Sequence, residues 1–188
     1  MWCPAPRWGG SWRALIVLAL LLPASISEAR DRYVIPRLGT LELSVPAKWQ
    51  VKFVYQEDLS DYPRWFLAPM DERLQLFMTI MWPVQGQAHA MPGIRDLLER
   101  IGRQALSFSD QDQLRIIELS AGHRPIYYYD LSDRGAQPPE YKYLRQGVVD
   151  LGDYVLVFTL LQNQAGSVDG EQVMAMLEGL RFQVFPGI

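Results

Sequence analysis

Two stretches of this sequence are apolar on both sides of an extended chain, and this property limits the fold more than any other. Residues 74–82 place Leu76 and Met78 on one side and Phe77 on the other, and residues 155–161 have the same character. A strand of this kind is stable where both of its faces are covered, in the interior of a sheet. The sequence therefore predicts a sheet with other elements packed on its two sides.

Further strands are predicted where apolar and polar residues alternate. In the first of them, Leu41 and Leu43 alternate with Thr40 and Glu42, which indicates a half-buried strand. The other segments are residues 51–55, 65–68, 114–119, 126–131 and 141–149. The last of these should form a hairpin with residues 154–161, because a glycine in the turn can adopt positive φ. We expect the sheet to be mainly antiparallel.

Two amphipathic helices are predicted to cover this sheet. Apolar residues recur at helical spacing over residues 94–105, and the charges of both signs on the opposite side indicate a solvated face. The second helix has Val173 and Leu177 in its buried stripe, and Asp169 with Gln172 is predicted to form its capping box. The expected fold class is α+β, a mainly antiparallel sheet flanked by helices on both faces.

The first 29 residues have the layout of a cleaved secretory signal. Arg7 and Arg13 precede an uninterrupted apolar run over residues 14–22, and small residues follow it. The run is much shorter than the ~20 residues that a membrane-crossing helix needs. We expect cleavage after Ala29, with Ser27 as the second choice. The product should lie in the periplasm or be secreted, without a stable membrane anchor.

Loss of residues 1–29 would also remove Cys3, the only cysteine. Because Cys3 is not at the expected cut, we expect no lipid anchor, and the mature chain would contain no disulfide and no cysteine metal ligand. Roughly 160 residues remain, which predicts one domain over residues 30–188. The net charge of -3 lacks the basic footprint of a nucleic-acid-binding protein.

Common catalytic and metal-binding motifs are missing from the sequence. There is no G-x-S-x-G, H-E-x-x-H, P-loop or G-x-G-x-x-G after a strand. His89 and His123 fall in a predicted loop and turn, where solvated histidines are the simpler interpretation. Asp110 and Asp112 have the spacing that opens a calcium loop, but Leu114 stands where the third oxygen ligand should be. We therefore predict no catalytic residue, metal or cofactor.

The most unusual feature is a high density of tyrosines in the second half of the chain. A speculative aromatic binding patch would contain Tyr127, Tyr128, Tyr129, Tyr141, Tyr143 and Arg124, with Lys142 and Arg145 at its rim. The alternative is structural, because tyrosines suit strands and pair well across them. The sequence leaves both interpretations open.

Two parts of the sequence resemble PsbP-like domains. In residues 39–49 a strand ends in a proline that is soon followed by a tryptophan. Residues 127–129, 141–147, 154–159 and 180–184 are similar in order and spacing to the second half of that family. The resemblance implies an α/β/α sandwich, and it implies accessory or binding roles that are mostly non-enzymatic. No metal or partner site of the family can be matched to residues of this chain.

These observations lead us to expect an exported, non-enzymatic accessory or binding protein of the cell envelope. Its partner would be a protein or a small molecule. Two alternatives remain open. One is a hydrolase-type enzyme with a loop-built site around His123, Arg124 and Asp130. The other is a structural partner in an envelope protein complex.

Overall fold

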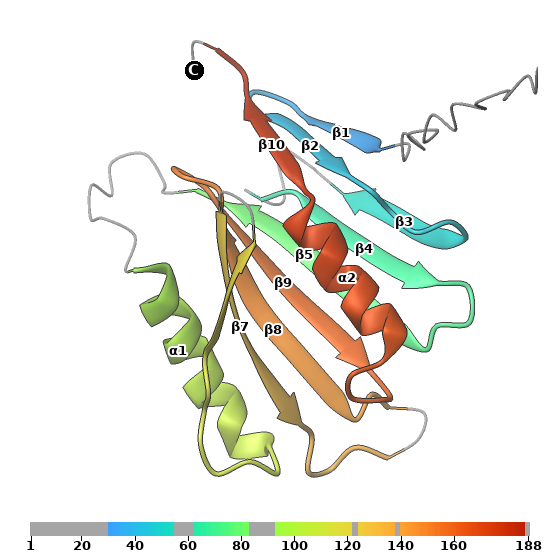
Figure 1. Cartoon of the computed structure of the whole chain (residues 1–188), viewed down its shortest axis with the longest axis vertical. Coiled ribbons are helices and arrows are strands. Elements are labelled where there is room, and N and C mark those ends of the chain that lie inside the picture. Colours follow the sequence, from blue (N-terminus) through green and yellow to red (C-terminus); the bar gives the residue numbers. More distant parts are fainter. Residues whose placement is uncertain (1–29, 55–61, 83–92, 122–123, 138–139, 187–188) are drawn as a thin grey trace, which may run out of the picture.

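Two antiparallel sheets make up most of the computed structural model, which describes residues 30–54, 62–82, 93–121, 124–137 and 140–186 (Figure 1). The smaller sheet has the order β1 (Asp31–Ile35), β2 (Gly39–Leu43), β10 (Arg181–Val184). The larger sheet has the order β3 (Trp49–Val54), β4 (Arg64–Pro69), β5 (Leu74–Met81), β9 (Val155–Gln162), β8 (Tyr143–Asp150), β7 (Arg124–Ser132), β6 (Ile117–Ala121). Every strand pair in the two orders is antiparallel, which confirms the mainly antiparallel α+β class.

Two helices pack on the larger sheet. Figure 1 shows α1 (Ile94–Ala105), in green, beside β7, and α2 (Val168–Glu178), in red, over the region of β5. A short 3-10 turn, Leu106–Phe108, follows α1. The capping box expected at Asp169 is wrong. Ser167 is the N-cap instead, and its hydroxyl accepts a hydrogen bond from the Gly170 backbone N–H at 3.0 Å.

The strands of the larger sheet send alternate residues into two apolar clusters. In β9, Leu156 and Phe158 join the larger cluster, which contains α2 and residues of the smaller sheet. Val155 and Val157 join the second cluster, which contains Leu98 of α1. Both β5 and β9 lie between two hydrogen-bonded neighbours, as their apolar faces predict.

The division into two sheets corrects the expectation of a single sheet. The pairing of β2 with β10 buries Thr40 to 2% exposure, although its polarity predicts an outward position. A Cβ on Gly39 would lie 2.1 Å from the Gln183 carbonyl oxygen, so only glycine allows this close approach. β10 has four residues, which is too short for its alternation to be recognised in the sequence.

The boundary of one strand also differs from expectation. β6 begins at Ile117, whereas the alternation predicts a strand from residue 114. Leu114 instead packs with the second cluster, where its side chain lies against Gly102 of α1. Packing against a helix therefore accounts for the apolar residue that the pattern assigned to the strand.

Candidate functional site

Strand alternation separates the tyrosines that were predicted to form a patch. Tyr127 and Tyr129 belong to the cluster with α1, whereas Tyr128 packs against the larger cluster. Tyr129 is fully buried, and its hydroxyl donates a hydrogen bond to Oε1 of Gln146. Because successive strand residues point to opposite faces, these three rings do not line one surface.

The remaining members of the predicted patch are also apart. Tyr141 precedes β8, and its hydroxyl donates to the Glu72 carbonyl oxygen at 2.7 Å. Burial, and then the charge of Glu72, raise the pKa of Tyr141. Tyr143 pairs with Ser132 at one end of β7, whereas Arg124 begins β7 at the other end. The structure therefore does not bring these residues together.

Tyr129 should ionise at a much higher pH than an exposed tyrosine, because burial raises its pKa to about 12. The unfolded phenol ionises near pH ~10. The contribution of Tyr129 to the free energy of unfolding should therefore be complete below about pH 10 and decline up to about pH 12. Urea unfolding across this range should show a smaller alkaline decline for Tyr129→Phe than for the unmodified protein. Equal declines would contradict this assignment.

Arg145 was expected at the rim of the patch, but it is a buried residue of β8 whose side chain contacts β7 and α2. Its guanidinium binds the Asp130 carboxylate through hydrogen bonds of 2.7 and 3.0 Å and lies 3.5 Å from Glu171. It also lies over the Tyr128 ring, 4.7 Å from the ring centre. Burial lowers the pKa of Arg145, but the hydrogen bond and charge of Asp130 outweigh burial and raise it. The contact with Glu171 joins α2 to the sheet, whereas Asp130 and Tyr128 both lie on β7.

The described members of the alternative hydrolase site are not brought together. Arg124 and Asp130 are six positions apart on one strand, which separates them by about 20 Å. Asp130 is bound by Arg145. His89 and His123 lie outside the described residues.

Acidic residues of the turns stabilise the backbone and neighbouring side chains. Asp110 binds Nζ of Lys142 at 2.9 Å, and this hydrogen bond is the main reason that the pKa of Asp110 is lowered. Asp150 accepts a hydrogen bond from the Gly152 backbone N–H at 2.8 Å, as expected for a turn aspartate. Within the described ranges, no group of three or more His, Cys, Asp or Glu side chains is placed to hold a metal ion.

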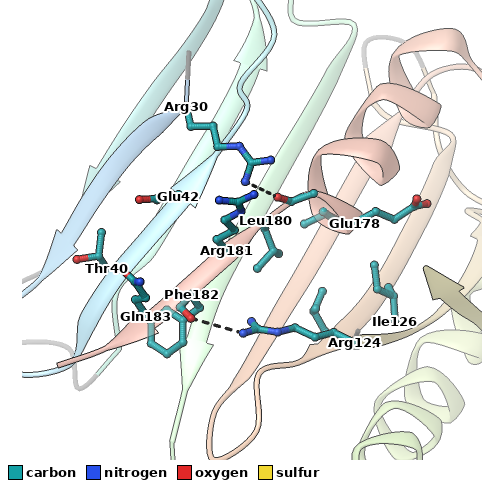
Figure 2. Close-up of a pocket in the computed structure, with 13 residues that line it drawn as sticks. Arg30, Thr40, Glu42, Arg124, Ile126, Glu178, Leu180, Arg181, Phe182 and Gln183 are labelled. Carbon is teal, nitrogen blue, oxygen red and sulfur yellow. Dashed lines mark hydrogen bonds between the residues drawn. The ribbon is translucent and has the colours of Figure 1, made fainter. Parts of the chain in front are cut away.

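A cavity of about 630 Å³ lies between the smaller sheet, the C-terminal end of α2 and the β7–β8 part of the larger sheet. Figure 2 shows Arg124 and Ile126 on one side of it and Thr40 and Arg181 on the other. Small-molecule sites typically have volumes of about 300–1,000 Å³ and combine apolar walls with a few polar groups. This cavity therefore has the size of a ligand site, and its lining combines apolar and charged side chains.

Charged side chains of both signs line the cavity, and most of them interact with the protein itself. They are Arg30, Arg124, Arg181, Glu42 and Glu178. Nη1 of Arg30 donates to the Gly179 carbonyl oxygen at 3.0 Å, which satisfies a free carbonyl at the end of α2. Glu42 lies 4.0 Å from Arg32 and is opposite Arg181 in the β2–β10 pairing.

Among the residues predicted for the binding site, Arg124 lines this cavity, whereas the five tyrosines do not. The other lining residues come from segments to which the sequence assigned structural roles only. The lining residues belong to three segments that come together only in the folded chain: residues 30–42, 124–149 and 177–183. No local motif could therefore have marked the cavity.

Comparison with known proteins identifies the fold. No family model and no curated protein matches the sequence. The chain is similar to the solution structure of cyanobacterial PsbP (CyanoP) from Synechocystis sp. PCC 6803, with a TM-score of 0.53 and 13% sequence identity. The match covers 93% of this chain and 98% of that one. The part of the chain that the structure describes has no helix with the length and apolar character to cross a membrane. At this identity the similarity shows the fold alone, and that fold is PsbP-like.

Proposed function

We propose that this chain is an exported, non-enzymatic binding protein of the cell envelope, and that the cavity between its two sheets is the binding site. The observation that carries the proposal is the cavity itself, whose volume of about 630 Å³ is lined by both apolar and charged side chains. The signal-like segment over residues 1–29 supports export to the periplasm, with residues 30–188 as the working domain.

We further propose a sandwich of the PsbP-like type, with one helix on each face of the larger sheet. The alternation along β9 supports this arrangement. Leu156 and Phe158 pack in the cluster that contains α2, whereas Val155 and Val157 pack in the cluster that contains α1. Residues that alternate along a strand point to opposite faces of its sheet.

The test begins with the full chain expressed in a bacterial host. The protein should be recovered from the periplasmic fraction with Arg30 as its first residue. In a small-molecule library, bound compounds should raise the Tm of the purified protein. Gln183→Trp, at an exposed position in the cavity lining, should abolish these Tm shifts, and Gln172→Trp on the exposed side of α2 should retain them.

Three outcomes would contradict the proposal. The first is uncleaved protein retained in the cytoplasm. The second is ligand binding that Gln183→Trp leaves unchanged. The third is turnover in a broad hydrolase screen that is lost in His123→Ala, which would instead support the enzyme alternative.

A further inference from the structure

Arg124 has hydrogen-bond donors that the fold leaves unused. A guanidinium carries five N–H donors. Nη2 of Arg124 donates to the Phe182 carbonyl oxygen at 3.5 Å, the long limit for a hydrogen bond, and Nη1 is buried without a partner. A buried donor without a partner is unfavourable. Nη1 has almost no exposed surface, so a ligand would reach it after a movement of the guanidinium.

Two carboxylates, those of Glu42 and Glu178, line the same cavity as Arg124. Among the residues that the structure describes, no carboxylate forms an ion pair with Arg124. Asp130, on the same strand, is bound by Arg145 instead. The C-terminal end of α2 would disfavour an anion, but Arg30 donates to its Gly179 carbonyl at 3.0 Å and offsets this effect.

Apolar side chains form part of the cavity wall, beside the charged ones. Ile126, Val149, Leu177 and Leu180 all line the cavity. Figure 2 shows the Arg124 side chain directed toward the Phe182 carbonyl, with Ile126 from the same strand near its base. A ligand that contacts both Arg124 and this apolar part of the wall would have an apolar body and a negatively charged end.

We propose that the cavity binds a small amphipathic oxyanion, and that the guanidinium of Arg124 binds its charged group. This inference rests on the proposed binding function. The planar fork of an arginine matches carboxylate and phosphate oxygens through paired hydrogen bonds, whereas a hydroxyl offers no such match. Carboxylate and phosphate share this chemistry, and the ligand's apolar body would pack against the walls of the cavity.

The test compares four probes by calorimetric titration of the purified domain: octanoate, octyl phosphate, octanol and inorganic phosphate. Octanoate and octyl phosphate should bind about tenfold or more tightly than octanol, because a charge-assisted hydrogen bond is lost in the alcohol. Inorganic phosphate should bind weakly, because it has no apolar body. The tighter of the two octyl anions identifies the preferred charged group.

Arg124→Met keeps much of the aliphatic stem and removes the donors. It should weaken octanoate binding about tenfold or more. The Tm of the ligand-free variant should be no lower than that of the unmodified protein, because the variant loses a buried donor without a partner. Arg64→Met, at an exposed position on β4 outside the cavity, should leave both properties unchanged. NMR of the unmodified protein provides a second measurement, in which octanoate should shift the Arg124 side-chain N–H resonance.

The outcomes separate the two proposals. If octanol binds as tightly as octanoate and Gln183→Trp blocks both, the cavity is a binding site but oxyanion recognition is wrong. If Arg124→Met retains full octanoate affinity, Arg124 does not bind the anion and the inference is overturned. The inference is also overturned if the ligand-free Tm of Arg124→Met falls and octanoate causes no shift of the Arg124 resonance in the unmodified protein. Either result would leave Arg124 with a structural role. If neither anion binds, the inference is also overturned, and the library screen then decides the proposed function.

Discussion

Replacing Trp65 with alanine should lower the free energy of unfolding by about 3–5 kcal/mol. Trp65 is fully buried and is among the largest buried side chains of the described residues. Its ring stacks on Phe53 with centres 4.8 Å apart, and Tyr33 of β1 meets it edge-on at 6.1 Å. Since Trp65 belongs to β4 and Tyr33 to β1, the indole holds the two sheets together. Its loss would leave a cavity that neither sheet can easily close.

Urea unfolding followed by circular dichroism measures this effect without relying on tryptophan fluorescence. Phe66→Ala is the matched control, because Phe66 is the next residue on β4 and is 37% exposed on the opposite face. It should cost less than about 1.5 kcal/mol. Trp65→Phe should also cost less than Trp65→Ala, because it keeps a ring and removes an indole N–H that is buried without a partner. Equal losses for Trp65→Ala and Phe66→Ala would refute the role of Trp65.

Asp130→Ala should destabilise the protein more than Arg145→Met, although both variants break the same ion pair. The Arg145 side chain is 10% exposed, whereas that of Asp130 is 47% exposed. Removal of Asp130 leaves a buried guanidinium whose remaining carboxylate, on Glu171, is 3.5 Å away and largely exposed. We expect a loss of about 2–3 kcal/mol for Asp130→Ala, below the usual range for fully buried pairs because water screens Asp130.

Arg145→Met removes the buried charge itself and leaves Asp130 in contact with water. Its cost should be nearer to about 1 kcal/mol. The double variant should be more stable than Asp130→Ala alone, which a double-mutant cycle would measure as a coupling energy. A double variant that is less stable than Asp130→Ala would show that Arg145 stabilises α2 mainly by packing rather than by charge.

The sequence predicted those elements whose periodicity is long and strong. β5, β9 and α1 were recognisable because each has eight or more residues with a repeated apolar pattern. β10 was missed because only Phe182 of its four residues is buried. The helix start at Ser167 was missed because serine and aspartate both make good N-caps. Local pattern alone could not choose between Ser167 and Asp169.

The candidate site was less predictable than the fold. The tyrosines are close in sequence, but alternation along β7 sends Tyr128 to one face and Tyr127 and Tyr129 to the other. The sequence indicates Arg124 by its proximity to these tyrosines, and its position in the cavity depends on the fold. Packing between distant segments determines which side chains lack a hydrogen-bond partner. A donor without a partner, such as Nη1 of Arg124, can therefore be identified only from the three-dimensional structure.

The pairing of β2 with β10 also determines when the cavity can form. Residues 39–42 near the start of the domain form ladder pairs with residues 181–184 near its end. Contacts between such distant segments form slowly, because a long loop must close before they are made. A nascent chain that lacks its last segment has no wall at residues 181–183 and hence no complete cavity. If the chain is exported, as proposed above, and crosses the membrane unfolded, this delay would postpone binding at the proposed site until the whole chain has crossed.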